Sequence, residues 1–200
     1  MASIDLSPAK AFYKSWLCCI MLSLFFITLC KSVGCVIEYY FAYGSNMNPA
    51  RMGARGLSTI NALAGTLEGF SLRFDKRATG KTGVAYANVG YQRDGRVEGV
   101  LYQLERPEDI VIMDPFEGNP VRYGREAFCV NTAEGVVHAW VYVANKAMLA
   151  KGLLPERAYL NHLLAGKQWH SNTYHQWLSE HICIESDNAD SELDGLIYNV

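Results

Sequence analysis

The chain has 200 residues, half of them hydrophobic (50%), which is enough to bury one sizeable core and does not call for a second domain. Its formal net charge of -2 has no basic run behind it, so the attraction to polyanions that drives nucleic-acid binding has no obvious source. We therefore expect one globular domain and no nucleic-acid partner.

Cysteine and histidine spacing argues against both a disulfide framework and a metal site. Most of the cysteines lie near the N-terminus, which leaves Cys129 and Cys183 in the body, so a secreted disulfide scaffold is not expected. Neither belongs to a C-x-x-C pair, and the histidines never show the spacing of an H-E-x-x-H helix. We predict no metal.

The N-terminal segment is strongly apolar. Residues 16–30 are apolar apart from one serine and one threonine, and Lys10 and Lys14 precede them, as in the n-region of a signal peptide. At about 1.5 Å per residue this run reaches only ~22 Å, less than the ~30 Å hydrocarbon core of a membrane unless it continues further. Two interpretations of residues 1–37 stay open: a hydrophobic leader that is a signal or anchor, with membrane association through residues 16–37, and an extension from a start site assigned too far upstream.

The folded body is expected to begin with a β-rich run at 38–43. Residues 44–46, Gly-Ser-Asn, suit a tight turn with exposed backbone amides. Asn48 suits the N-cap of a short helix, and the proline after it suits the first helical position. We expect this helix to end near Gly53 or Gly56.

Residues 57–75 alternate loosely and are interrupted by glycines, which predicts a strand, a bend and a second strand. Two apolar runs then flank Asp94-Gly95, at 84–89 and 97–104. Because Asp-Gly between apolar runs is a strong hairpin signal, we expect these two strands to pair with each other.

A second helix is predicted to open at Pro107, with carboxylates in its first turn, and to run to about Phe116. Glu117 follows directly after the end of this predicted helix. The alternating runs at 125–131 and 136–144 predict another hairpin.

The C-terminal part changes to helical spacing. After Pro155, apolar residues fall on one side of a predicted helix until Gly166, and Asn172 can cap a final helix. Residues 185–200 are rich in carboxylates and lack Lys and Arg, which predicts a loose acidic tail. The whole pattern indicates an α+β domain at 38–184, a small mixed β-barrel or curled sheet with short inserted helices and a C-terminal helical pair.

Glu117 is the leading candidate for chemistry. It follows an apolar run at 110–113 and Phe116, so its carboxylate lies where a helix ends beside the core. Desolvation there would raise its pKa toward the range useful in acid-base catalysis. The alternative is a solvated glutamate before a glycine turn. Ser45 lacks a G-x-S-x-G elbow and is interpreted as a turn serine, and Cys129 as a small hydrophobe in an apolar strand.

Several motifs in order resemble one family. Tyr-Phe-Ala-Tyr-Gly-Ser-Asn at 40–46 resembles the substrate loop of γ-glutamylcyclotransferases, including AIG2-like proteins, and Asp-Pro-Phe-Glu-Gly at 114–118 resembles their catalytic D-x-x-E-G. Tyr123 is similar to the tyrosine that follows in that family, and Tyr159 is similar in placement to a tyrosine that contacts substrate. The resemblance spans about residues 38–182.

The resemblance implies a fold, a reaction and a site. The reaction is a cofactor-independent intramolecular aminolysis of a γ-glutamyl amino acid or peptide, which releases 5-oxoproline. Glu117 would be the catalytic carboxylate. The implied substrate-binding residues are Tyr40, Phe41, Ala42, Tyr43, Gly44, Ser45, Asn46, Tyr123 and Tyr159.

Two alternatives stay open on this resemblance: a γ-glutamylamine cyclotransferase, and a non-catalytic module that binds small γ-glutamyl metabolites. The Y-G-S-N-M-N form of the loop resembles enzymes that act on γ-glutamyl amino acids and peptides. We expect a cytoplasmic catalytic domain, with the N-terminal membrane segment or signal peptide as the open question. The oligomeric state is not predicted.

Overall fold

The computed structural model describes residues 36–185. Most of the leader predicted at 1–37 and nearly all of the acidic tail lie outside the described residues, so both interpretations of the leader stay predictions. Within residues 36–185, no helix is both long enough and apolar enough to cross a membrane.

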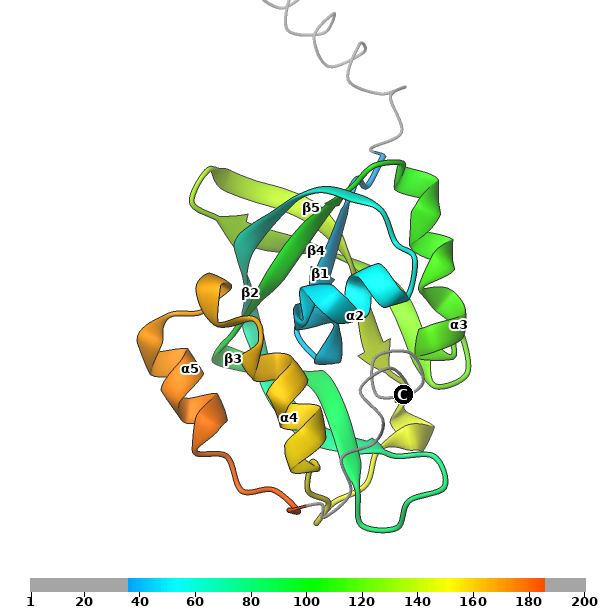
Figure 1. Ribbon diagram of the computed structural model, residues 1–200, viewed down its shortest axis with the longest axis vertical. Helices are drawn as coiled ribbons and strands as arrows, with labels where there is room; N and C mark the ends of the chain where they lie inside the picture. Colours follow the sequence, from blue (N-terminus) through cyan, green and yellow to red (C-terminus); the bar gives the residue numbers. More distant parts are fainter. Residues whose placement is uncertain (1–35, 186–200) are drawn as a thin grey trace, which may run out of the picture. The chain divides into compact units, whose positions relative to one another are not determined.

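Five strands form a closed barrel in the order β1-β3-β2-β4-β5 (Figure 1). The strands are β1 (Tyr39–Ala42), β2 (Thr59–Arg77), β3 (Ala85–Leu104), β4 (Tyr123–Thr132) and β5 (Gly135–Ala144). Neighbouring strands pair antiparallel, except that β1 and β5 pair parallel and close the barrel. This confirms the predicted α+β fold with a small mixed barrel.

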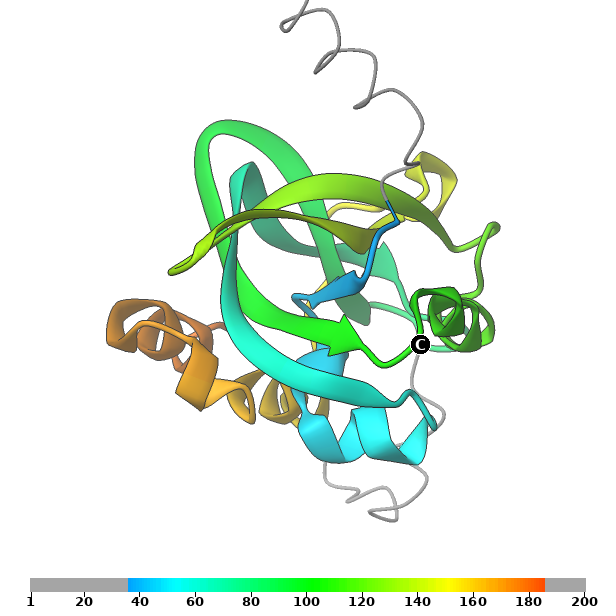
Figure 2. The ribbon, with the colours of Figure 1, turned by 90° about the horizontal axis from the view of Figure 1, so that it is seen from above.

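Short helices are inserted between the strands. The α-helices are α2 (Pro49–Ala54), α3 (Asp114–Glu117), α4 (Arg157–Leu164) and α5 (Asn172–Ser179). The 3-10 helices are η1 (Ser45–Met47), η2 (Pro107–Ile112), η3 (Lys146–Met148) and η4 (Lys167–Trp169). Figure 2 shows α2, α4 and α5 gathered along one side of the curved strands, with α3 on another side. The predicted C-terminal helical pair is thus confirmed as α4 and α5.

Helix α2 begins where the sequence predicts. The side chain of Asn48 accepts a hydrogen bond from the amide of Ala50 at 3.0 Å, and Pro49 occupies the first helical position. Helix α2 therefore starts immediately after the turn at 44–46, and this brings residues of the helix next to the turn.

The hairpin predicted around Asp94-Gly95 is wrong. Residues 85–104 form one long strand, β3, and both halves of it pair antiparallel with β2. Gly69, with a φ of 80°, stands opposite a bulge in β3, and a Cβ at Gly95 would lie 2.4 Å from the carbonyl oxygen of Phe70. The glycine at 95 therefore allows a close approach of β3 to β2, and β2 likewise runs through the predicted bend as one strand.

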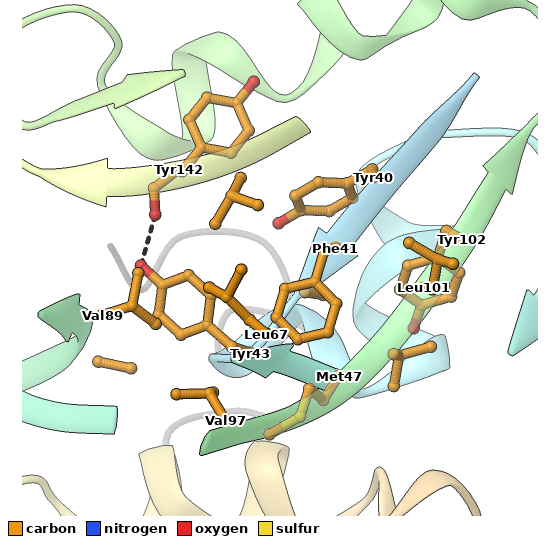
Figure 3. Close-up of a cluster of buried hydrophobic side chains, with 14 of the residues drawn as sticks. Tyr40, Phe41, Tyr43, Met47, Leu67, Val89, Val97, Leu101, Tyr102 and Tyr142 are labelled. Atoms are coloured by element: carbon orange, nitrogen blue, oxygen red, sulfur yellow. Dashed lines mark hydrogen bonds between the residues drawn. The ribbon is translucent and has the colours of Figure 1, made fainter. Parts of the chain in front are cut away.

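Phe41 lies at the centre of the barrel. Its side chain is fully buried and lies among Leu67, Val97 and Leu101 in Figure 3. Gly99 on β3 leaves room for it: a Cβ there would lie 2.9 Å from Phe41 Cζ and 2.4 Å from the carbonyl oxygen of Ala42. The barrel interior is thus packed around an aromatic ring that glycine accommodates.

We expect Gly99→Ala to lower the free energy of unfolding by about 1–3 kcal/mol, because the added methyl group meets backbone that cannot move freely. The matched control is Gly53→Ala in α2, where a Cβ would meet nothing within 4 Å and where alanine is the better helix former. Denaturant unfolding of both variants checks this. Equal stability of the two variants would contradict the packing account.

Candidate active site

A pocket opens where β1 runs into the turn before η1. Its cavity volume is about 30 Å³, and it is open to solvent. Segments far apart in the chain meet there: the first strand and turn, the start of β3, the end of α3, β4, β5 and α4. The lining residues are Tyr40, Tyr43, Gly44, Ser45, Asn46, Tyr86, Ala87, Glu117, Tyr123, Tyr142 and Tyr159.

Most of the predicted site residues lie in this pocket, and two do not. Glu117, Tyr123 and Tyr159 line it together with the turn at 43–46. Phe41 and Ala42 are buried in the hydrophobic core and do not line the pocket. The geometry gives these two residues a packing role.

Asn46 connects the motif at 40–46 to Glu117 of the motif at 114–118. Its Nδ2 donates to Glu117 Oε1 at 2.8 Å and to the Tyr40 hydroxyl at 2.7 Å, and its Oδ1 accepts from Arg55 Nη1 at 2.8 Å. Because arginine can only donate and a carboxylate only accepts, these contacts fix the orientation of the amide. The Asn46 carbonyl also accepts from the Tyr102 hydroxyl at 2.9 Å, so Asn46 is held on several sides and orients Glu117.

Glu117 is a buried carboxylate at the end of α3. Its exposed fraction is 8%, which shows that the alternative of a solvated glutamate is wrong. Gly118 follows in the left-handed region at a φ of 62°, where glycine is favoured, and ends the helix. The sequence prediction that a helix delivers Glu117 beside the core is confirmed.

Burial controls the electrostatics of Glu117. Desolvation raises the pKa of its carboxyl, and the charge of Arg55 and the hydrogen bond from Asn46 oppose that rise without cancelling it. Arg55 Nη1 lies 3.5 Å from Glu117 Oε1. A carboxyl with a raised pKa releases and regains a proton closer to neutral pH, which suits acid-base chemistry.

Tyrosine hydroxyls anchor the start of β3 at the pocket. The amide of Ala87 donates to the Tyr159 hydroxyl at 3.0 Å, and the Tyr123 hydroxyl donates to the Ala87 carbonyl at 2.8 Å. Gly44 packs against the same place, since a Cβ there would lie 3.1 Å from the Tyr159 hydroxyl oxygen. Tyr159 and Tyr123 are thereby fixed in position beside the turn.

Asp114 connects α3 to the barrel. It accepts from the Tyr142 hydroxyl at 2.6 Å, and Arg125 Nη1 lies 3.1 Å from its carboxylate oxygens. The Tyr142 carbonyl in turn accepts from the Tyr43 hydroxyl at 2.5 Å, which Figure 3 shows as a dashed line. The first acid of the D-x-x-E-G motif therefore holds in place the helix that carries Glu117.

Several residues that line the pocket or lie next to it were not predicted from the sequence. Arg51 and Arg55 are buried charges that lie one turn apart on and just after α2, and Tyr86, Tyr142 and Lys76 belong to strands. The four-residue spacing of the two arginines immediately after the turn is a signal that could have been noticed. Nothing in the local pattern of the strands marks Tyr86, Tyr142 or Lys76.

Cys129 lies away from the pocket. It lies in β4, as the prediction of a strand position requires, but its side chain is exposed, with its Sγ 3.9 Å from His138 Nδ1, and is not part of the core. Alternation places its side chain on the outside of the barrel, between the inward-facing Val130 and its partly buried neighbour Phe128. Among the described residues, no group of three or more His, Cys, Asp or Glu could hold a metal ion.

A family model described as "Gamma-glutamyl cyclotransferase, AIG2-like" matches residues 40–171, which include the turn, Glu117 and Tyr159. The chain belongs to this family. No match was found among curated proteins compared by sequence.

Solved structures show the same γ-glutamyl cyclotransferase fold. One named "Gamma-glutamyl cyclotransferase" is 20% identical, with a TM-score of 0.66 over 78% of this chain and 94% of that chain. An uncharacterized protein from Homo sapiens, loc79017, gives 20% identity and a TM-score of 0.66 over 78% and 95%. YkqA from Bacillus subtilis gives 21% identity and a TM-score of 0.62 over 76% of this chain and 55% of its own.

Membership of the γ-glutamyl cyclotransferase family supports cyclotransferase activity in general and a small-molecule substrate. At these identities the structural likeness speaks for the fold alone.

Proposed function

We propose that this chain is a cofactor-independent γ-glutamyl cyclotransferase that acts on γ-glutamyl amino acids or peptides, with Glu117 as its base and acid. The observation that carries the proposal is the hydrogen bond between Asn46 and Glu117 at 2.8 Å inside the pocket. It joins a turn suited to hold the substrate to a buried carboxylate with a raised pKa.

The reaction is an intramolecular aminolysis. The α-amine of the γ-glutamyl group attacks its own γ-carbonyl carbon, a C–N bond closes the five-membered ring, and the original amide C–N bond breaks. The amine loses a proton and the leaving nitrogen gains one. A single carboxylate placed between the two nitrogens can accept the first proton and deliver the second, and this is the role we assign to Glu117.

Binding the glutamyl part falls to the turn at 44–46. The first amides of a helical turn such as η1 have no partner within it, and such convergent N–H groups bind carboxylates and oxyanions. Glycine at 44 lets the backbone come close to a ligand. With Tyr159 and Tyr123 fixed by Ala87, the walls can hold the substrate folded back on itself, which lowers the entropic cost of ring closure.

Of the alternatives, a non-catalytic binding module fits the pocket poorly. A substrate that carries a carboxylate is repelled by a second buried carboxylate, so binding alone gains nothing from Glu117. Catalysis gives that carboxylate a use. The γ-glutamylamine alternative differs only in the leaving group and is decided by experiment.

The proposal is tested by incubating the purified full chain with γ-glutamylalanine, glutathione and γ-glutamylethylamide and measuring 5-oxoproline by mass spectrometry. We expect 5-oxoproline and free alanine in equal amounts from γ-glutamylalanine. Product from γ-glutamylethylamide alone would favour the amine cyclotransferase. No 5-oxoproline from any of the three would contradict the enzyme.

A further inference from the structure

Lys76 is a buried cation that the reaction described above does not use. It lies on β2, opposite Tyr86 of β3, with no exposed surface. Its Nζ has no hydrogen-bond partner among the described residues. A buried ammonium group with unused donors is costly unless an anion compensates for it.

The ammonium group lies beside two rings that line the pocket. Nζ is 4.9 Å from the ring centroid of Tyr86 and 5.3 Å from that of Tyr123. Contacts of this length with aromatic faces stabilise a cation but leave its N–H donors unspent. Lys76 does not itself line the pocket; it is a buried charged donor held against the rings of two tyrosines that do.

The charges around Lys76 leave it able to bind an anion. Burial and, to a smaller extent, the positive charge of Arg122 lower the pKa of Lys76 to about 8, against the opposing effect of the negative charge of Glu117. The two tyrosines whose rings it faces, Tyr86 and Tyr123, have raised pKa values and are neutral. With a pKa of about 8, most of the Lys76 population keeps its proton at neutral pH, so a positive charge is present next to the pocket tyrosines Tyr86 and Tyr123.

We propose that the ammonium group of Lys76 binds the carboxylate of the amino acid that leaves. The proposal rests on the proposed function, in which the turn amides take the glutamyl carboxylate and Glu117 takes the α-amine. The leaving amino acid then carries the one anionic group of the substrate that has no assigned partner. A γ-glutamyl amine lacks that carboxylate, so Lys76 would make the enzyme selective for γ-glutamyl amino acids.

The test uses two substrates that differ only in that carboxylate, γ-glutamylalanine and γ-glutamylethylamide, with 5-oxoproline as the product of both. In Lys76→Met the ratio of their kcat/KM values should fall at least about tenfold, as expected for a lost hydrogen-bonded charge pair. The effect should appear mainly in KM. Lys81→Met is the matched control, because Lys81 is partly exposed and pairs with Glu156 at 2.8 Å, and its ratio should stay at the wild-type value.

The outcomes separate the two proposals. If wild-type protein makes no 5-oxoproline from either substrate, the proposed function fails. If wild-type protein is active and Lys76→Met lowers kcat/KM for both substrates equally, the assignment of Lys76 to the leaving group is overturned, since a loss of its charge acting on Glu117 would have that effect. An unchanged ratio with unchanged rates also overturns it.

A second measurement on wild-type protein covers the case in which Lys76→Met does not fold. The ratio of kcat/KM for γ-glutamylalanine over γ-glutamylethylamide should decline as the pH rises through about 8, because Lys76 loses its charge there. Titration of Glu117 and of the substrate α-amine affects both substrates and cancels in the ratio. A ratio that stays flat across this range overturns the proposal.

Discussion

Glu117→Gln is expected to lower kcat/KM for 5-oxoproline release by about 10²–10⁴-fold, the usual contribution of a positioned acid-base group. The glutamine carbonyl can still accept the hydrogen bond from Asn46, so the pocket should keep its shape. What is lost is the group that takes a proton from the α-amine and returns it to the leaving nitrogen.

The control for this variant is Glu126→Gln, which removes an exposed carboxylate from β4 outside the pocket and should leave the rate unchanged. Circular dichroism and thermal unfolding report whether each variant is folded. A folded Glu117→Gln protein with full activity would show that Glu117 does not carry the reaction.

Arg55→Met is expected to lower the free energy of unfolding by about 3–5 kcal/mol at neutral pH, because it leaves Glu117 as an uncompensated buried charge. The Arg55 side chain has no exposed surface, and its guanidinium donates to Asn46 Oδ1 and lies 4.8 Å from the ring centroid of Phe116. Denaturant unfolding measures the loss. The double variant Arg55→Met/Glu117→Gln should recover part of it, since the unpaired charge is then gone.

The same variant predicts a pH dependence. The folded-state pKa of Glu117 is above its ordinary value, so folding favours the neutral form, and this contribution to stability is present at low pH and lost as the pH rises through the folded pKa. Arg55 lowers the pKa of Glu117, so removing Arg55 raises this pKa further. The stability that is lost as Glu117 ionises with rising pH is then larger in the variant than in wild type. The stability gap between wild type and Arg55→Met should therefore widen with rising pH, and the acid limb of kcat/KM should move to higher pH. A gap independent of pH would contradict the assigned pairing.

The sequence predicted the elements whose signals are local. Asn48 and the proline after it mark the start of α2, the glycine at 135 marks the β4–β5 hairpin, and Pro107 opens the helical segment that ends at Glu117. In each case the residues that determine the structure lie within a few positions of each other, so the pattern along the chain contains the information.

The predictions from sequence were wrong or missing where a residue's structure depends on contacts with residues far along the chain. Asp94-Gly95 has the composition of a turn, but the pairing of both flanking runs with β2 keeps β3 in one piece. Arg55 and Lys76 are charged residues that local pattern assigns to the surface, and only the fold buries them beside Glu117 and the pocket tyrosines. Local propensity is overridden by tertiary contacts at such positions.

The most direct test of the central claim is to run the γ-glutamylalanine reaction in oxygen-18 water and follow the label by mass spectrometry. Cyclisation uses the α-amine as nucleophile, so the account predicts free alanine and an equal amount of 5-oxoproline without label. Hydrolysis would use water instead. Glutamate carrying oxygen-18 as the main product would contradict the account.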